Sequence, residues 1–414
     1  MRKLLSLFLI GAFLCGGLLA ASAQPAPASL TTPTPAQQSL DPAAATQAWL
    51  ATIPADKRAE SDAYFEGGYW LILWNFLLAA AVSLLLLWSG ISARLRDSAE
   101  RTTRFRSLRV AIYALAYILL VSILTFPLDL YSGYFREHAY GLATQNFPAW
   151  MGDQVKGLIV ALILAPILLM VLYGVFRRAP RTWWIWGTVV GVAFLILGML
   201  IGPIFIEPIF NTYKPLTDPK ISAPILAMAA ANEIPVKQVF EVDASRQSNR
   251  VSANVAGIFG TARIALNDNL LKQCTLPEIR AVMAHEMGHY VLNHAMKLVL
   301  YFSLIILIGF ALVSVFFDRC VRRWGARWGV RGIADPAGLP LLALIFSTYF
   351  FLLTPLQNTI VRTTEREADA FGINTAREAD GFAKVALKLG TYRKLNPGKW
   401  EEIFFFDHPS GRAR

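Results

Sequence analysis

The chain has 414 residues, of which 55% are hydrophobic and only 16% are charged. With a mean hydropathy of +0.45, it is too apolar for an ordinary soluble domain, and the composition predicts a multi-span membrane protein. The net charge of +11 would suit a nucleic-acid-binding protein. The basic residues instead cluster beside apolar segments, which is typical of cytoplasmic membrane loops, and the sequence has no nucleic-acid motif. Three widely separated cysteines, at positions 15, 274 and 320, exclude a disulfide framework and a cysteine metal site.

Residues 1–23 are either a cleaved secretory signal or a retained first transmembrane helix. Arg2 and Lys3 precede an apolar run that ends in small residues, as in a signal, but the run is long for one, and both interpretations remain open. Either of them places the following residues outside the cytoplasm. Residues 24–67 are predicted to form a flexible extracytoplasmic linker, because the stretch from Gln24 to Lys57 is rich in Pro, Ala, Thr and Ser.

Apolar segments of about 20 residues, the length that a bilayer requires, predict the membrane part. A four-span bundle is expected over residues 68–206, with spans at 69–89, 110–131, 157–176 and 183–205. A transmembrane hairpin is expected over residues 297–357, with spans at 297–317 and 339–357. The fold class is therefore a polytopic α-helical membrane protein with six spans, or seven if the first apolar run is retained.

Arginines crowd the loops after the first, third and fifth of these spans. The positive-inside rule places such loops in the cytoplasm. The two polar segments, 207–296 and 358–414, then share the opposite, extracytoplasmic side of what we expect to be a bacterial-type inner membrane. Segment 207–296 is predicted to contain a helix at Ile221–Asn232, strands at Gln238–Val242 and Arg263–Asn267, and a turn at Ser245–Asn254, which indicates a small α/β region.

A histidine pair one helical turn apart, His285 and His289, lies near the end of segment 207–296 in the pattern H-E-x-x-H. On a helix both rings share one face and can bind a single ion, whereas Glu286 points beside that ion, where a general base for a metal-activated water belongs. Thr275 and Glu278 form a capping-box pattern that predicts the start of this helix. The alternative is a surface helix with two solvated histidines, but the chain has only five histidines in all.

A catalytic zinc ion needs a third protein ligand, and segment 358–414 offers three carboxylates on a predicted helix. Glu365 and Asp369 are four residues apart and share one face. Glu365 can bind the metal, while Asp369 can accept a hydrogen bond from a ligand histidine and fix its tautomer. Glu367 lies on the other side and stays open as an alternative ligand. A solvated charged face is the competing interpretation. Nearer the end, His408 could donate to a developing oxyanion.

Together these motifs resemble the type I CAAX prenyl endopeptidases, integral-membrane zinc peptidases of the gluzincin kind. The similarity rests on segments spread over the C-terminal half: Glu207–Asn211, Asn254 with Arg263–Asp268, His285–His294, Glu365–Asp369 and His408–Arg414. The resemblance implies one Zn²⁺ held by His285, His289 and Glu365, with Glu286 as the base. It also implies transition-state help from His408 and Arg414, peptide positioning by Asn254, and a helical barrel around a large chamber.

The function expected is a membrane-embedded zinc metalloendopeptidase that acts on membrane-associated, lipidated, CAAX-like or misfolded peptides. The substrate is expected to lie extended along the strand at Arg263–Asn267, since an open sheet edge offers main-chain hydrogen bonds. Two alternatives remain: a catalytically inactive, zinc-bearing membrane scaffold, and a transporter. A transporter would carry ionisable groups within its spans, and the predicted spans contain almost none.

Overall fold

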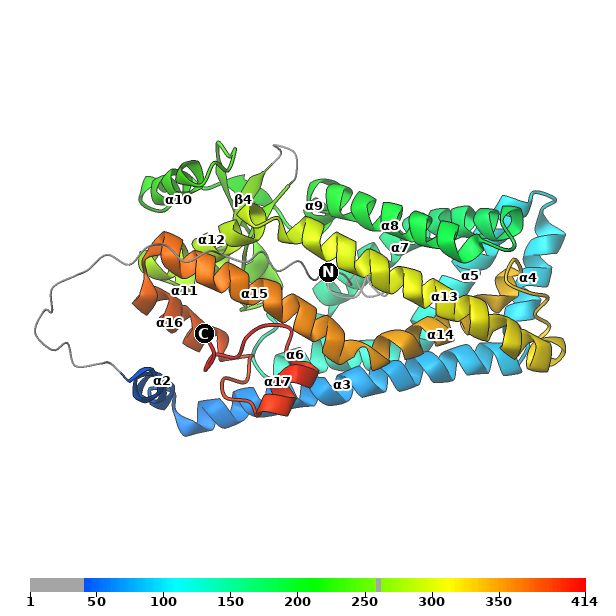
Figure 1. Cartoon of the computed structure of the whole chain (residues 1–414), viewed down its shortest axis with the longest axis horizontal. Coiled ribbons are helices and arrows are strands. Elements are labelled where there is room, and N and C mark those ends of the chain that lie inside the picture. Colours follow the sequence, from blue (N-terminus) through cyan, green and yellow to red (C-terminus); the bar gives the residue numbers. More distant parts are fainter. Residues whose placement is uncertain (1–40, 258–261) are drawn as a thin grey trace, which may run out of the picture.

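The computed structural model describes residues 41–257 and 262–414, so the prediction for residues 1–23 lies outside the described part. The molecule is elongated, with long helices running toward one end and a small sheet with short helices at the other (Figure 1). The prediction of a polytopic α-helical membrane protein with a small α/β region is confirmed by this architecture.

Five helical stretches in the described residues are long and apolar enough to cross a membrane. They are α3 (Ala55–Trp88), α5 (Arg106–Leu130) continued by α6 (Arg136–Ala139), α7 (Phe147–Arg178), α8 (Trp183–Ile201) continued by α9 (Glu207–Phe210), and α13 (His294–Trp328). Each contains a predicted span. Many of their large apolar side chains are exposed, among them Ile123, Leu300 and Ile204, as expected of surfaces that face lipid.

The last predicted span, 339–357, is bent rather than straight. Helix α14 (Leu339–Leu352) meets α15 (Thr354–Ala376) at an angle of 58°, and the pair counts as a sixth span only if both helices are taken together. Pro355 falls in the first turn of α15, and a proline there lacks the N–H that a continuous helix would need. Because α15 runs on past residue 357, a helix that starts beside the membrane part carries Glu365 and Asp369.

The predicted flexible linker at 24–67 is wrong over its described part. Helix α2 (Pro42–Ala51) is capped by Asp41, whose side chain accepts a hydrogen bond from the N–H of Ala43. Helix α3 already starts at Ala55. Alanine-rich sequence favours helix, and proline is well placed in a first helical turn. The composition that suggested a linker therefore also suits helices. Tyr64, near the start of α3, is buried, so this part of α3 packs against the rest of the protein.

The arginine-rich loops gather at the end of the molecule opposite the sheet. Helix α4 (Ile91–Thr102) lies there, next to the connection from α13 to α14 (Figure 1). Buried Arg96 of α4 lies 2.5 Å from Asp335 in that connection. The charge asymmetry found in the sequence is therefore also a spatial asymmetry, with basic loops at one end and the two polar segments at the other.

The sheet at the other end has four strands in the order β1-β2-β4-β3. These are β1 (Tyr213–Pro215), β2 (Val239–Val242), β3 (Ala253–Ala256) and β4 (Arg263–Asn267). Strand β4 pairs in parallel with β2 and antiparallel with β3. The predicted strand at Arg263–Asn267 is thus an inner strand and not an open edge. The edge beside it is β3, which the sequence had suggested was the end of a turn.

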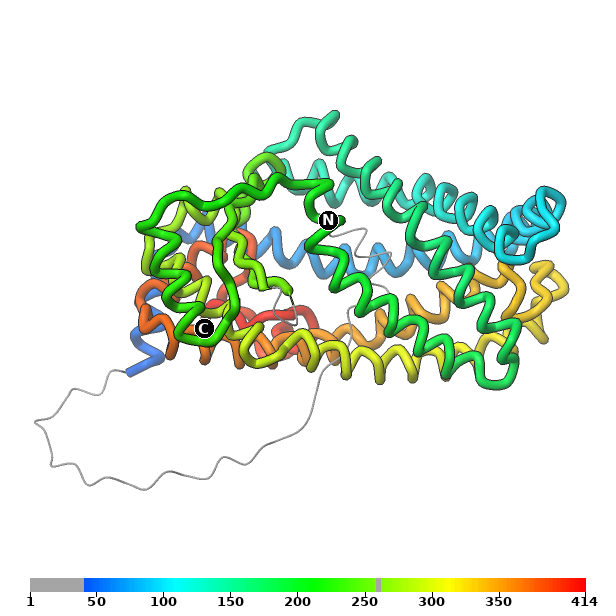
Figure 2. Tube along the Cα trace, turned by 90° about the horizontal axis from the view of Figure 1, so that it is seen from above, coloured from blue at the N-terminus to red at the C-terminus, as the bar shows by residue number. Residues whose placement is uncertain are grey.

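Helices α10 (Pro219–Ala231), α11 (Asp268–Gln273) and α12 (Leu276–Val291) pack against this sheet, and α16 (Ala379–Leu389) packs against α12. A second core beneath them joins the sheet to α10 and α12, with Ile225, Ile264 and Met283 fully buried. Figure 2 shows the later part of the chain, in orange and red, returning alongside α12 and the sheet. Helix α17 (Lys399–Phe405) and the final residues complete this end of the molecule.

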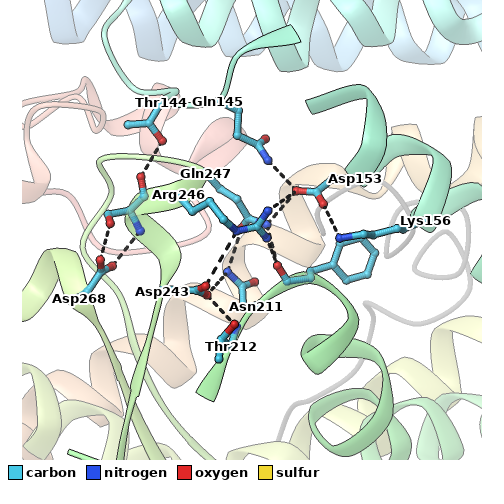
Figure 3. Close-up of polar contacts among 12 residues, drawn as sticks. Thr144, Gln145, Asp153, Lys156, Asn211, Thr212, Asp243, Arg246, Gln247 and Asp268 are labelled. Atoms are coloured by element: carbon cyan, nitrogen blue, oxygen red, sulfur yellow. Dashed lines mark hydrogen bonds and ion pairs between the residues drawn. The ribbon is translucent and has the colours of Figure 1, made fainter. Parts of the chain in front are cut away.

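Polar contacts fasten the sheet region to the membrane helices (Figure 3). Asp153 of α7 accepts hydrogen bonds from Gln145, at 2.6 Å, and from Gln247, at 3.1 Å, and it pairs with Lys156. Asp243, at the end of β2, accepts from the backbone N–H of Thr212 at 2.7 Å. These contacts join α7, the loop before it and the segment that leads to β3, so the position of β3 is coupled to the bundle.

Helices α12 and α15 approach each other closely, backbone to backbone, at the sheet end. A Cβ added at Gly372 of α15 would lie 2.9 Å from the N atom of His285, and one added at Gly288 of α12 would lie 3.2 Å from Cα of Ala368. Any other residue type at position 372 would push the two helices apart, and one at position 288 would crowd Ala368 and Phe371. The approach of the H-E-x-x-H helix to the carboxylate helix therefore depends on these two glycines.

We expect Gly372→Ala to separate α12 from α15 by a few tenths of an ångström, because the neighbour is backbone and cannot rotate away. The strain should cost about 1–3 kcal/mol and lower both the melting temperature in detergent and the affinity for Zn²⁺. The control is Gly198→Ala in α8, where an added Cβ meets nothing within 4 Å and the alanine should favour the helix. Equal melting temperatures and metal affinities for both variants would contradict the close-packing argument.

Candidate metal centre and active site

Helix α12 begins as the capping pattern predicts. Glu278 accepts the backbone N–H of Thr275 at 2.6 Å, and its buried carboxylate also pairs with Lys388 of α16 at 2.8 Å. From this start the helix turns Ile279 and Met283 into the core under the sheet. Because an α-helix has 3.6 residues per turn, His285 and His289 lie on the opposite face of α12, which is turned toward α15.

Three side chains from the two polar segments meet on that face. Nε2 of His285 lies 3.1 Å from Nε2 of His289. The carboxylate of Glu365, from α15, places Oε2 at 3.3 Å from the first nitrogen and Oε1 at 3.4 Å from the second. In the described residues this is the group of His, Cys, Asp and Glu that could hold a metal, with its donor atoms within 4.8 Å of one another.

The donor set fits a zinc ion. Bonds of 2.0–2.1 Å in a tetrahedron separate neighbouring donor atoms by about 3.3–3.4 Å, close to the separations of 3.1, 3.3 and 3.4 Å in this group. Two imidazoles and one carboxylate are also the protein ligands of a well-known class of catalytic zinc sites, which keep a fourth position open. The residues that the sequence predicted as ligands are thus brought together in a geometry that suits the ion.

Asp369 supports His285 from behind. Its Oδ1 lies 2.8 Å from Nδ1 of His285, on the side of the ring away from the donor group. Burial alone would lower the pKa of His285, but the carboxylates of Asp369 and Glu365 outweigh burial and raise the pKa to about 9. For His289 burial dominates and lowers the pKa to about 4. A histidine must be neutral to bind a metal, so His289 could bind without losing a proton, whereas His285 would release one when a cation binds.

Glu286 has an environment that suits a base at neutral pH. Burial raises the pKa of its carboxyl to about 7, and the nearby charge of Glu365 adds to the rise, while His285 and Arg414 oppose it. A general base works best when its pKa lies near the operating pH, because it is then both deprotonated and able to accept a proton. A divalent cation beside it would favour the ionised form further.

The end of the chain also reaches this site. Arg414 places Nη2 at 3.3 Å from Glu365 and Nε at 3.1 Å from Asp369, and His408 places Nε2 at 3.3 Å from Glu365. Arg362 of α15 anchors the backbone just before His408, because it donates to the backbone carbonyl of Glu402 at 2.8 Å and to that of Phe406. Both C-terminal residues named by the resemblance therefore lie at the donor group.

Asn254 sits on β3, the edge strand, which packs against α12. Its Oδ1 is buried and accepts no hydrogen bond within the described residues. A buried amide oxygen without a donor costs about 1–3 kcal/mol, and Asn254 is one of six residues in the described part of the chain with a buried side-chain atom that has no hydrogen-bond partner.

Glu367 lies away from the donor group. Its carboxylate pairs with His294 at 3.0 Å and with Lys297 at 2.7 Å, so the geometry favours Glu365 as the third donor. The contact from His294 to His289, at 2.9 Å, was missed by the sequence analysis. The available signal was that His294, in a chain so poor in histidine, follows His289 by little more than one helical turn.

Known proteins resemble this chain over most of its length. Residues 42–212 match the family model of the CAAX prenyl protease N-terminal region with five membrane helices, and residues 215–414 match the model of peptidase family M48. An uncharacterized metalloprotease, YhfN, of Bacillus subtilis is 31% identical over 81% of this chain and 80% of its own. CAAX prenyl protease 1 of Saccharomyces cerevisiae is 27% identical over 74% of this chain and 72% of its own.

The solved structure of S. mikatae Ste24p shows the same fold. It superposes with a TM-score of 0.71 at 22% sequence identity and covers 87% of this chain and 89% of its own. Together with the two matching family models, this places the motif helix and the helical bundle in one known architecture. The chain belongs to peptidase family M48, with the CAAX prenyl proteases, and is a multi-pass membrane metalloprotease.

Proposed function

We propose that the chain is a zinc endopeptidase that cleaves peptide bonds of membrane-associated substrates, with Glu286 as general base. The observation that carries the proposal is the convergence of His285, His289 and Glu365, with donor atoms within 4.8 Å, from segments far apart in the sequence. The proposed metal would be held by these three side chains. When bound, it supplies Lewis acidity that makes a water molecule nucleophilic near neutral pH and polarises a carbonyl.

The protein's own groups would move the protons. Glu286 takes a proton from the attacking water and delivers it to the leaving amine. Asp369 keeps the Nδ1 proton of His285 in place and so directs Nε2 of that ring to the metal. Both roles are supported by the burial of these carboxyl groups and by the 2.8 Å contact between Asp369 and His285.

His408 and Arg414 would stabilise the negative charge that develops on the carbonyl oxygen. Both lie 3.3 Å from the same oxygen of Glu365, so both have donors beside the place where the reacting carbonyl must sit. Preorganised donors of this kind often contribute most to catalysis, since they need no reorganisation during the reaction.

The substrate is proposed to lie along β3, because β4 is an inner strand. A peptide added to β3 would extend the sheet through main-chain hydrogen bonds, which demand little of the substrate's sequence. Asn254 would then fix the register of the peptide by donating or accepting through its buried amide. This arrangement suits a protease that accepts varied peptides.

The substrates are proposed to be membrane-tethered, whether lipidated with a CAAX-like end or misfolded. Several relatives are named CAAX prenyl proteases, and the site lies at one end of the spans. The arginine-rich loops lie at the other end, so the positive-inside rule supports a site outside the cytoplasm. Cytoplasmic prenylated proteins would not reach such a site, which favours other lipidated or misfolded membrane peptides.

Glu286→Gln should keep the metal and lose catalysis by about 10²–10⁴-fold, whereas Glu365→Ala should lose the metal. The measurements are zinc content of the purified protein and cleavage of a quenched-fluorescent peptide, with and without a farnesylated cysteine near its end. Wild-type protein stripped with a chelator and reloaded with Zn²⁺ serves as the control. An active Glu286→Gln enzyme would refute the proposed base. Bound zinc without any cleavage by the wild type would favour the inactive scaffold.

Asn254→Ala should raise KM with little change in kcat, because the amide binds the peptide equally in the ground and transition states. A loss of about 1–2 kcal/mol corresponds to a rise of roughly 5- to 30-fold. Asn232→Ala, at the residue that follows α10, is the control, because this amide donates only to Met228 of its own helix among the described residues, and the variant should leave KM unchanged. A fall in kcat at constant KM would instead assign Asn254 to the chemical step.

The side of the membrane can be tested with single cysteines in a chain whose native cysteines are replaced by serine. Lys237→Cys marks the sheet end and Arg323→Cys marks the basic end, and both positions are exposed. In right-side-out vesicles an impermeant maleimide should label residue 237 and spare residue 323. Inverted vesicles should give the opposite pattern. If residue 323 is labelled from outside, the active site faces the cytoplasm.

A further inference from the structure

A chain of polar contacts leads from the back of His289 to the surface of the protein. Nδ1 of His289 lies 2.9 Å from Nδ1 of His294, and Nε2 of His294 lies 3.0 Å from Oε2 of Glu367. The same oxygen of Glu367 lies 2.7 Å from Nζ of Lys297. The side chain of His294 is only 1% exposed, whereas that of Glu367 is 43% exposed. None of these outer groups belongs to the donor group itself.

The turn between α12 and α13 creates this contact. Asn293 adopts a left-handed conformation, with φ 54° and ψ 38°, which asparagine tolerates better than most residues. Helix α13 starts directly after it, and its first residue is His294. The helix is therefore interrupted at Asn293, and this break sets the imidazole of His294 beside that of His289. Glu367 lies on α15, two residues after Glu365. Helix α15 therefore supplies the carboxylate beside Nε2 of His289 and also the carboxylate that contacts His294.

Only one arrangement of protons satisfies all of these atoms. Nε2 of His289 faces the donor group and must offer its lone pair to a metal, so a neutral ring carries its proton on Nδ1. That proton can be donated to Nδ1 of His294, since two bare nitrogens at 2.9 Å would repel each other. His294 then carries its own proton on Nε2, which points at the carboxylate of Glu367.

We propose that His294 and Glu367 are positioning residues that fix the ring and the tautomer of His289. The proposal rests on the proposed metal centre. It gives the two ligand histidines different supports: His285 contacts the carboxylate of Asp369 directly, whereas His289 reaches the carboxylate of Glu367 through a second imidazole. Lys297 pairs with Glu367 at the outer end of this relay.

The first test separates hydrogen bonding from packing at position 294. His294→Leu fills the space without an acceptor and should weaken Zn²⁺ binding about 10- to 100-fold, as loss of such outer partners does. His294→Asn places an oxygen near the position of Nδ1 and should restore most of the affinity. The measurement is competition with a chromophoric chelator for Zn²⁺ in detergent, so it needs no peptide substrate and no knowledge of the activity.

The second test uses exposed Glu367, whose replacement should not prevent folding. Glu367→Ala should weaken Zn²⁺ binding several-fold in the wild-type background but have no further effect in His294→Asn, which lacks the link to residue 367. If Glu367 acted only through the electrostatic field of its charge, Glu367→Ala would weaken Zn²⁺ binding by the same factor in both backgrounds. The matched control is Glu60→Ala, which removes a carboxylate of 46% exposure from a lysine pair at 2.8 Å and should leave the affinity unchanged.

Two results would overturn the proposal. One is a folded His294→Leu protein with wild-type Zn²⁺ affinity, and the other is an equal loss in His294→Asn and His294→Leu, which would reduce His294 to a packing residue. If His294→Leu fails to fold, additive effects of Glu367→Ala and His294→Asn would overturn it instead. Failure of the proposed function gives a different result from failure of this proposal. It would appear in the wild-type protein itself, which would bind no zinc or would bind zinc and cleave no peptide.

Discussion

The contact between α12 and α15 is the constraint on which the rest of this structure depends. A side chain at position 372 would hold the partner helix farther away, and the carboxylate of Glu365 would then shift relative to the two imidazoles. Because donor atoms must lie within a few tenths of an ångström of fixed separations to bind a metal well, tight backbone packing is a functional requirement here. Protein interiors resist deformation, so the packed helices also keep this geometry.

The membrane hairpin explains how two distant segments come to share one site. Helix α13 leaves from the end of α12, and α14 with α15 returns to the same end, so the hairpin closes a loop in space although it separates the segments in the sequence. The bend of 58° between α14 and α15 changes direction where the chain leaves the apolar part. The hairpin thus acts as a scaffold that sets the register of the donor group.

The charges around the site indicate why a cation belongs there. Glu286, Glu365 and Asp369 bring three carboxyl groups into a confined region, and Arg414 pairs with two of them. Buried carboxylates are costly unless they are paired, and burial already raises the pKa of Glu286 toward neutrality. A divalent ion would balance the remaining charge and keep Glu286 ionised. The proposed catalytic base and the proposed metal therefore stabilise each other.

The sequence by itself determined the features that are local in the chain. It located the spans, because apolar length is a property of consecutive residues; it predicted the start of α12 from Thr275 and Glu278, and the common face of His285 and His289 follows from helical period alone. The tertiary structure alone decided the features that join distant segments. It favoured Glu365 over Glu367, made β3 rather than β4 the edge strand, turned the described part of the expected linker into α2 and the start of α3, and set His294 behind His289. Those outcomes depend on packing between segments, and packing distances such as that at Gly372 are not written in any single stretch of sequence.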